Sequence, residues 1–310
     1  MPGIGIISNP HSKLNRKNPQ RHEYLTYIAG EEGHVAVTQT LEDLAKVAED
    51  FREHGIKILA INGGDGTISQ TLTAFIKTYG SATLPKIVLL RGGTINVLAE
   101  NLGIKGSPEQ VLYRLIEKHS INKLETTRRV STLVAGGQHG FLFGNGTAAN
   151  FLELFYQNKT GPLGSLLLFV RLMISRLSKK TLYDSVAKSV DTAVIVDSDK
   201  KPSHQSISTL IATIPRMPLG FKLFPKTTEN SQLAQLVSYT GDARKDIFKA
   251  VFDFFVRPSK STDAKISYCG KSFSVECGEP TPYTLDGELF YPEGNVVDVQ
   301  IGTELEFIIV

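Results

Sequence analysis

The chain has 310 residues, of which 41% are hydrophobic and 21% are charged, an ordinary globular composition that suggests two domains. The formal net charge is only +3 and the sequence contains no long basic tract, so nucleic acid is not an expected partner. The two cysteines, Cys269 and Cys277, do not make a disulfide framework and indicate a reducing compartment.

The N-terminal residues MPGIGIISNP contain neither a basic leader nor a long apolar run, so no signal peptide is expected. The most apolar segment, 160–170, is interrupted by Arg171 and is shorter than the roughly 20 residues that a membrane-spanning helix needs. We therefore expect a cytoplasmic protein whose contact with the inner membrane surface is at most peripheral.

Strand and helix patterns alternate through the first part of the chain. The expected strands lie at residues 3–10, 34–40, 56–61 and 86–93, and the expected helices at 21–33, 41–55, 95–104 and after residue 67. Continuous apolar runs such as 56–61 are typical of strands that are buried in a parallel sheet. The alternation predicts an open, mostly parallel α/β domain over residues 1–127, with helices on both faces of its sheet.

After about residue 128 the pattern changes to short strands separated by turn residues. These strands are expected at 129–137, 139–146, 185–196, 206–214, 234–241, 264–270, 272–278, 295–302 and 304–310. Helices are expected at 147–157, 162–177 and near 242–256. The pattern predicts a β-rich, antiparallel sandwich or barrel-like domain over residues 128–310.

The segment Gly63-Gly64-Asp65-Gly66-Thr67 lies where the strand at 56–61 meets the next helix. Glycine allows tight turns and close approach of backbone N–H groups to a ligand, and a helix N-terminus, expected here near Thr67 or Ile68, favours phosphate. Asp65 would repel a phosphate unless a divalent cation lies between them or Asp65 faces a substrate hydroxyl. A purely structural strand-to-helix turn is the alternative.

A second glycine-rich turn, GGTIN at residues 92–96, follows the next strand. Ligands of open α/β sheets bind beyond the carboxyl ends of the strands, so the two turns are expected to face each other across one crevice. A third, weaker turn after the first strand offers Asn9 and Ser12 as phosphate ligands. Three such turns predict a nucleotide site, although neither a Walker A lysine nor the six-position dinucleotide fingerprint is present.

Several short motifs occur in a particular order along nearly the whole chain. They are Asn9-Pro10-x-Ser12, Thr38 with Asp43, the loop at 63–67, Gly93-Thr94-x-Asn96 with Ala99 and Leu102-Gly103, and Asp286-Gly287-Glu288. Their order and spacing resemble the diacylglycerol kinase catalytic-domain family, which includes bacterial lipid kinases, sphingosine kinases and ceramide kinases. The resemblance is specific for the family but not for the substrate.

The resemblance implies an α/β domain of the kind found in NAD kinases and diacylglycerol kinases, with a lipid site between it and the β-rich domain. It implies transfer of the γ-phosphoryl group of ATP, with Mg²⁺, to a lipid hydroxyl such as that of diacylglycerol or a sphingoid base, as in phospholipid biosynthesis. Peripheral membrane contact and a homodimer are compatible with this activity.

The resemblance also implies roles for individual residues. The implied nucleotide-binding residues are Asn9, Ser12, Thr38, Gly63, Gly64, Gly66, Thr67, Thr94 and Asn96. Asp65 would act through magnesium, with Glu125 as a second carboxylate. Asp286 and Glu288 would lie near the acceptor hydroxyl, one of them as the general base.

Two departures from the family pattern leave alternatives open. Ser69-Gln70 stands where the family often has Asn-Glu, and Val97 stands where it often has Asp, which removes one carboxylate from the usual magnesium network. These departures suggest a nucleotide- or lipid-binding relative without activity as one alternative. The other is a kinase of a soluble acceptor such as NAD, because that family shares the glycine-Asp-glycine loop.

The segment YTLDGELF, residues 283–290, has two interpretations. Asp286-Gly287 is typical of a two-residue hairpin turn that needs no catalytic role. The resemblance favours a catalytic role, and both interpretations hold if the turn presents a carboxylate to the substrate. The apolar, basic-ended segment 160–180 is similarly typical either of a core helix or of an acyl-chain wall or membrane-surface helix.

Overall fold

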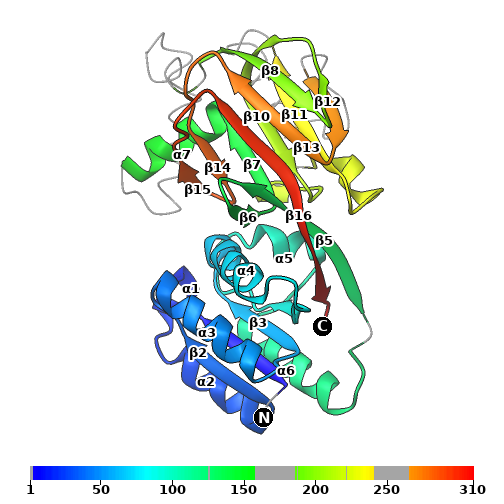
Figure 1. The fold of residues 1–310 in the computed structure, drawn as a ribbon. Coiled ribbons are helices and arrows are strands. Elements are labelled where there is room, and N and C mark those ends of the chain that lie inside the picture. Colours follow the sequence, from blue (N-terminus) through cyan, green and yellow to red (C-terminus); the bar gives the residue numbers. More distant parts are fainter. Residues whose placement is uncertain (1–2, 125, 158–185, 187, 221, 241–264) are drawn as a thin grey trace. The chain divides into compact units, whose positions relative to one another are not determined.

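The computed structural model describes residues 3–124, 126–157, 186, 188–220, 222–240 and 265–310. The chain forms two compact units. Figure 1 shows the fold, coloured by position along the sequence. The first unit consists of Met1–Thr132, Arg216–Gly220 and Gly302–Val310, and the second of Leu133–Pro215 and Phe221–Ile301. The C-terminal segment thus belongs to the first unit, whereas the sequence patterns placed it with 128–310. The helices expected at 162–177 and 242–256 lie outside the described residues.

A parallel sheet forms the centre of the first unit, as predicted. Its strands are β1 (Ile4–Ser8), β2 (Gly33–Val37), β3 (Ile58–Asn62) and β4 (Lys86–Leu89), in the order β4-β3-β1-β2. The end of β16 (Val296–Ile308) adds a further parallel pairing beside β4, with Phe307 opposite Ile87. Every residue of β1 and β3 is buried, as expected for strands covered on both faces.

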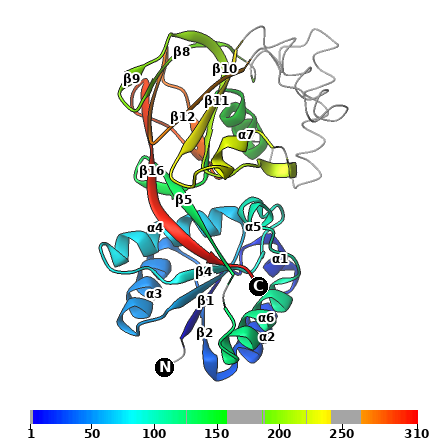
Figure 2. The same ribbon diagram turned by 90° about the vertical axis from the view of Figure 1, so that its right-hand side faces the viewer.

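Helices cover both faces of this sheet. They are α1 (Lys13–Lys17), α2 (Arg21–Ala29), α3 (Leu41–Glu53), α4 (Asp65–Tyr79), α5 (Val97–Leu102) and α6 (Pro108–Ser120), with a 3₁₀ turn at Gly30–Glu32. α3 and α4 pack together on one face, and α2 and α6 on the other (Figure 2). α6 is absent from the sequence prediction, although Ser107 and Gln110 form a capping box at its start.

The structure explains two residues at the sheet and helix α3: Gly5 by close packing and Asp43 by helix capping. A Cβ on Gly5 of β1 would lie 2.2 Å from the ring of Phe51, so only glycine lets α3 pack this closely on the sheet. Asp43 forms a capping box with Thr40 at the start of α3, and its carboxylate also accepts the backbone N–H of Gln39. Asp43, one of the motif residues, therefore caps a helix.

The second unit is rich in antiparallel strands. The strands are β6 (Gln138–Gly140), β7 (Leu142–Asn145), β8 (Val190–Val196), β9 (Asp199–Lys200), β10 (His204–Ala212), β11 (Ala234–Thr240), β12 (Lys265–Gly270), β13 (Ser272–Cys277), β14 (Tyr283–Leu285) and β15 (Glu288–Phe290). The end of β5 (Thr127–Ala135) and the first part of β16 also belong to this unit, and the rest of both strands belongs to the first unit. They pair in the order β15-β14-β7-β10-β8-β13-β16, and β11 joins β10 to β12.

One helix and one hydrophobic core complete the description of the second unit. α7 (Thr147–Gln157) has the bounds that were predicted for it. Short 3₁₀ turns lie at Pro218–Gly220, which belongs to the first unit, and at Pro225–Thr228. Phe143, Phe273 and Leu236, from three different strands, are buried in the shared core.

β16 corrects one expectation. The sequence suggested two strands, at 295–302 and 304–310, but the structure has a single strand across Val296–Ile308. Its first half pairs antiparallel with β13 and its last residues pair parallel with β4, so Gly302 lies inside a strand instead of in a turn. Within the described ranges, no helix combines the length and the apolar character needed to cross a bilayer.

Candidate functional site

The two glycine-rich turns of the first unit are in direct contact. They follow the neighbouring strands β3 and β4. A Cβ on Gly93 would lie 2.4 Å from the Cα of Gly64, and one on Gly92 would lie 2.8 Å from the backbone nitrogen of Gly63. The expectation that these turns face each other across a crevice was therefore wrong. None of these four glycines has a positive φ, so close backbone approach is the reason for glycine here.

Two non-glycine residues in the left-handed region shape the second turn. Arg91 has φ 58° and Asn96 has φ 53°. The Asn96 side chain accepts the N–H of Gly93 at 3.1 Å and donates to the carbonyl of Gly93 at 3.0 Å. The guanidinium of Arg91 donates to the carbonyl of Ile104 at 2.7 Å. These contacts hold a conformation that side chains usually avoid.

The turn after β1 is tied to both glycine turns. Asn9 Nδ2 donates to Thr67 Oγ1 at 2.8 Å, and the Ser12 hydroxyl donates to the carbonyl of Gly92 at 3.1 Å. The three turns, predicted separately as phosphate ligands, thus form one connected structure at the carboxyl edge of the sheet. Thr38 lies just past the end of β2, buried, and its N–H donates to the carbonyl of Ser8 at 3.1 Å.

Two buried asparagines, Asn15 and Asn62, form hydrogen bonds beneath the surface next to these turns, and sequence reasoning missed both. Asn15 Nδ2 donates to the carbonyl of Asn9 at 2.7 Å, and Asn62 Nδ2 donates to Ser8 Oγ at 2.9 Å and to Asn15 Oδ1 at 3.2 Å. The only signal in the sequence was the asparagine at the end of a buried strand, directly before the glycines. The Nδ2 groups of both residues donate to backbone and side-chain groups, which links the turns to one another.

Asp65 is held against the start of α5. Burial raises the pKa of its carboxyl group, and hydrogen bonds from the backbone N–H groups of Val97, Leu98 and Asn96 oppose that rise. The N-cap of α5 has no side-chain cap of its own, so the carboxylate of Asp65 serves as one. Asp65 Oδ1 is buried and lacks a hydrogen-bond partner in the part of the chain that the structure describes.

The N-terminus of α4 has no side-chain cap. The helix begins at Asp65, two or three positions before the predicted start near Thr67 or Ile68. Gly64 is its N-cap residue, with no side-chain hydrogen bond to the first turn. A 15-residue helix with uncapped N–H groups at its start attracts an anion through those groups and through its dipole. Thr94, in the adjacent turn, is exposed.

Asp65 could bind a magnesium ion only if phosphate and water supplied the remaining ligands. Across the described ranges, no group of three or more His, Cys, Asp or Glu side chains is placed to bind a metal ion, and Glu125 lies outside them. Mg²⁺ in nucleotide sites commonly takes one or two carboxylates and completes its shell with phosphate and water. The unpartnered Asp65 Oδ1 matches that requirement.

In the second unit, Asp286 and Gly287 form the predicted hairpin turn between β14 and β15. Their φ values of 50° and 88° are those of a type I′ turn. The Asp286 carboxylate accepts the backbone N–H of Phe141 at 3.0 Å and of Leu142 at 2.9 Å, so it holds the hairpin to the β6–β7 segment. Glu288 is half-buried at the start of β15.

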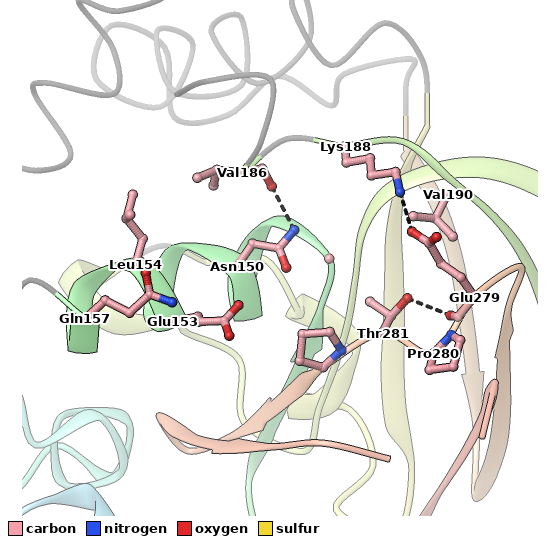
Figure 3. A pocket seen from close by; sticks show the side chains of 12 residues that line it. Asn150, Glu153, Leu154, Gln157, Val186, Lys188, Val190, Glu279, Pro280 and Thr281 are labelled. Carbon is pink, nitrogen blue, oxygen red and sulfur yellow. Dashed lines mark hydrogen bonds and ion pairs between the residues drawn. The ribbon is translucent and has the colours of Figure 1, made fainter. Parts of the chain in front are cut away.

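A cavity of about 320 Å³ lies beside α7 in the second unit (Figure 3). It is lined by Gly146, Asn150, Glu153, Leu154, Gln157, Val186, Lys188, Val190, Glu279, Pro280, Thr281 and Pro282. Lys188 pairs with Glu279, and Asn150 Nδ2 donates to the carbonyl of Val186 at 3.1 Å. The lining thus combines hydrogen-bonding groups with apolar surface, as ligand sites commonly do.

Part of the first unit is similar in sequence to known proteins. Residues 4–127 match the family model described as Diacylglycerol kinase catalytic domain. A protein named probable lipid kinase YegS from Shigella flexneri is 35% identical over 88 residues, which are 28% of this chain and 29% of that protein. Its namesake from Escherichia coli (strain K12 / DH10B) is 36% identical over 79 residues, 26% of each chain. The matched segments span less than a third of these curated relatives.

Solved structures match almost the whole fold. A putative diacylglycerol kinase from Bacillus anthracis str. Sterne has a TM-score of 0.72 at 16% identity, covering 99% of this chain and 97% of that one. A second structure, titled as a diacylglycerol kinase of the same organism, has a TM-score of 0.67 at 13% identity, covering 99% and 96%. The fold is that of the diacylglycerol kinases. At 13–16% identity these structures show a shared fold, and the match to the diacylglycerol kinase catalytic-domain model is confined to residues 4–127.

Proposed function

We propose that this protein is a lipid kinase that transfers the γ-phosphoryl group of ATP, with Mg²⁺, to the hydroxyl group of a lipid such as diacylglycerol or a sphingoid base. The observation that carries the proposal is the connected set of turns at the carboxyl edge of the first unit. There an uncapped helix N-terminus lies beside a buried carboxylate oxygen without a partner. Anion-binding donors and a cation-binding acid at one place suit a magnesium nucleotide.

Phosphoryl transfer needs mainly positioning and charge neutralisation from the protein. The N–H groups at the start of α4 would bind the phosphates, and the ties from Asn9 to Thr67 and from Ser12 to Gly92 would keep the turns rigid around them. Asp65 Oδ1 would hold Mg²⁺, which offsets negative charge on the γ-phosphate when it is bound.

The second unit would supply the general base and the acceptor site. Both oxygens of Asp286 lie within hydrogen-bonding distance of the N–H of Phe141, so we assign the base to Glu288 and a turn-holding role to Asp286. We assign the polar end of the acceptor to the cavity beside α7, where Asn150 and Glu153 offer hydrogen-bonding groups next to apolar Leu154. Peripheral membrane contact follows from the proposal, because such acceptors reside in bilayers.

The test is a labelled-phosphate assay with defined acceptors. Purified protein is incubated with γ-labelled ATP, Mg²⁺ and vesicles that contain diacylglycerol, sphingosine or ceramide, and in parallel with soluble NAD. We expect a labelled lipid that is lost in Asp65→Ala and kept in Asp50→Ala, a control on the exposed side of α3. Formation of labelled NADP would contradict the lipid acceptor and indicate a kinase of soluble NAD. ATP binding without any product would contradict kinase activity and indicate a catalytically inactive relative.

A further inference from the structure

Helix α7 has two neighbours in the second unit. Asn150, Glu153 and Leu154 line the cavity of Figure 3. The same helix also contacts β14 and β15, beside which it lies in Figure 1. The helix that forms a wall of the cavity is therefore also in contact with the hairpin that bears Glu288.

Two tyrosine hydroxyls make polar contacts between α7 and the hairpin region. Tyr156, near the end of α7, donates its hydroxyl to the carbonyl of Gly287 at 2.8 Å. Tyr291, directly after β15, donates its hydroxyl to Glu153 Oε1 at 2.9 Å. One bond thus reaches the tip of the turn and the other reaches the far end of β15. Glu153 takes part in both structures, because it lines the cavity and accepts the bond from Tyr291.

On the β14 side the hairpin is held by pairing with β7 and by the Asp286 carboxylate, whereas β15 is an edge strand. β15 has three residues, lies at the end of the strand order and, among the strands that the structure describes, pairs only with β14. A short edge strand is among the parts of a fold that open most easily, because half of its backbone groups lack a strand partner. The position of Glu288 therefore depends on what holds the strand from outside the sheet.

Charge supports the same arrangement. Burial and the negative charge of Glu288 raise the pKa of the Tyr156 phenol. The hydrogen bond to Glu153, followed by burial, raises the pKa of the Tyr291 phenol. Both phenols therefore stay protonated at neutral pH and remain hydrogen-bond donors.

We propose that Tyr156 is a positioning residue for Glu288, and that Tyr156 and Tyr291 together clamp hairpin β14–β15 to helix α7. The clamp is a property of the second unit alone. Its importance for catalysis rests on the proposed function, because only a phosphoryl transfer that uses Glu288 as base would require it. Two measurements test separately whether the clamp exists and whether it matters for catalysis.

The first measurement is hydrogen exchange, followed by mass spectrometry, of a peptide that covers 283–291. Removing the hydroxyl in Tyr156→Phe or Tyr291→Phe keeps the ring and deletes one bond. We expect the hairpin amides to exchange at least several-fold faster in each variant, with the melting temperature nearly unchanged. Tyr24→Phe, an exposed tyrosine of α2 in the first unit, is the matched control and should leave the peptide unchanged. Wild-type exchange rates in both clamp variants would overturn the clamp.

The second measurement is steady-state kinetics with whichever acceptor the labelled-phosphate assay identifies. Tyr156→Phe is expected to lower kcat about tenfold with the KM for ATP unchanged, because a misplaced base slows the chemical step without weakening nucleotide binding. Faster hairpin exchange with an unaltered kcat would refute the positioning role and keep the clamp as a structural contact. Should no acceptor be phosphorylated, the proposed function and the positioning role fail together, and exchange still decides the clamp.

Discussion

Gly64 and Gly93 come from turns on different strands, and their backbones touch. A methyl group on Gly93 would lie 2.4 Å from the Cα of Gly64, a distance that real side chains essentially never show. The contact joins the first turn of α4 to the loop that leads into α5, and Asp65 bridges the same two elements with its carboxylate. The glycines are thus needed because the two backbones meet, and this contact holds the two turns in a fixed position relative to each other.

Gly93→Ala is expected to separate the two turns. Neither partner is the end of a flexible side chain, so the strain should cost about 1–3 kcal/mol of unfolding free energy. Nucleotide affinity should fall at least about tenfold if the turns bind phosphate. Denaturant unfolding and calorimetric titration with ATP measure both effects. Gly3→Ala is the control, because its methyl group would have nothing closer than 3.8 Å. Equal behaviour of the two variants would contradict the contact.

Asp286 and Glu288 should respond differently to loss of charge. Asp286→Asn puts an amide where Phe141 and Leu142 donate, so unfolding free energy should fall by about 1–3 kcal/mol. Glu288→Gln should leave stability within about 0.5 kcal/mol and lower kcat strongly, since it removes the proposed base.

Unfolding curves and initial rates of the two variants answer this together. Wild-type stability of Asp286→Asn would contradict the turn-holding role of Asp286, and wild-type activity of Glu288→Gln would contradict the assignment of Glu288 as the base.

The hydrogen bond between Asn9 and Thr67 should give a measurable coupling. Asn9 Nδ2 donates to Thr67 Oγ1 at 2.8 Å in a partly buried position. Thr67→Val keeps the shape and deletes the acceptor, and Asn9→Ala deletes the donor. A double-mutant cycle on unfolding free energy should return about 0.5–1.5 kcal/mol. A coupling near zero would mean that the first turn is held by its other contacts alone.

Asp65 should make stability depend on pH. Burial raises the pKa of its carboxyl group in the folded chain above the ordinary value of 3.8, so the folded state binds this proton more tightly than the unfolded state does. The stability that this proton contributes is present below pH 3.8 and is lost as pH rises through the higher folded pKa. Asp65→Asn should abolish that loss.

The measurement is the unfolding free energy of both proteins from pH 4 to pH 8, compared as a difference so that other titrating groups cancel. A difference that is flat over this range would show that the N–H groups of α5 fully offset the effect of burial.

Prediction from the sequence succeeded where local patterns suffice. The parallel sheet follows from apolar runs such as the one in β3, and the type I′ hairpin follows from Asp286-Gly287 alone. Motif spacing also located the three turns. The roles of the residues within them depended on partners far away in the chain, which no local pattern reveals. Asp286 accepts bonds from a backbone 145 positions earlier, and Asn62 is fixed by Ser8 and Asn15.

Two predicted element boundaries, the strand break at Gly302 and the start of α4, were wrong for a related reason. Gly302 suggested a turn between two strands, but tertiary pairing with β13 on one side and β4 on the other keeps the chain extended through it. α4 starts at Asp65 because that carboxylate is taken up by the next helix, an arrangement that depends on the loop before α5. In both cases contacts between distant segments overrode the local signal.

The end of β16 has a consequence for how the protein is made. Leu305, Phe307 and Ile308 are almost completely buried in the unit that begins with the first residues of the chain, and Phe307 pairs beside β4. During synthesis the N-terminal half leaves the ribosome with that side of β4 uncovered until residues 302–308 have emerged. A nascent chain stalled before residue 302 should therefore bind chaperones that recognise exposed strands, and a chain in which residues 302–308 have emerged should no longer bind them.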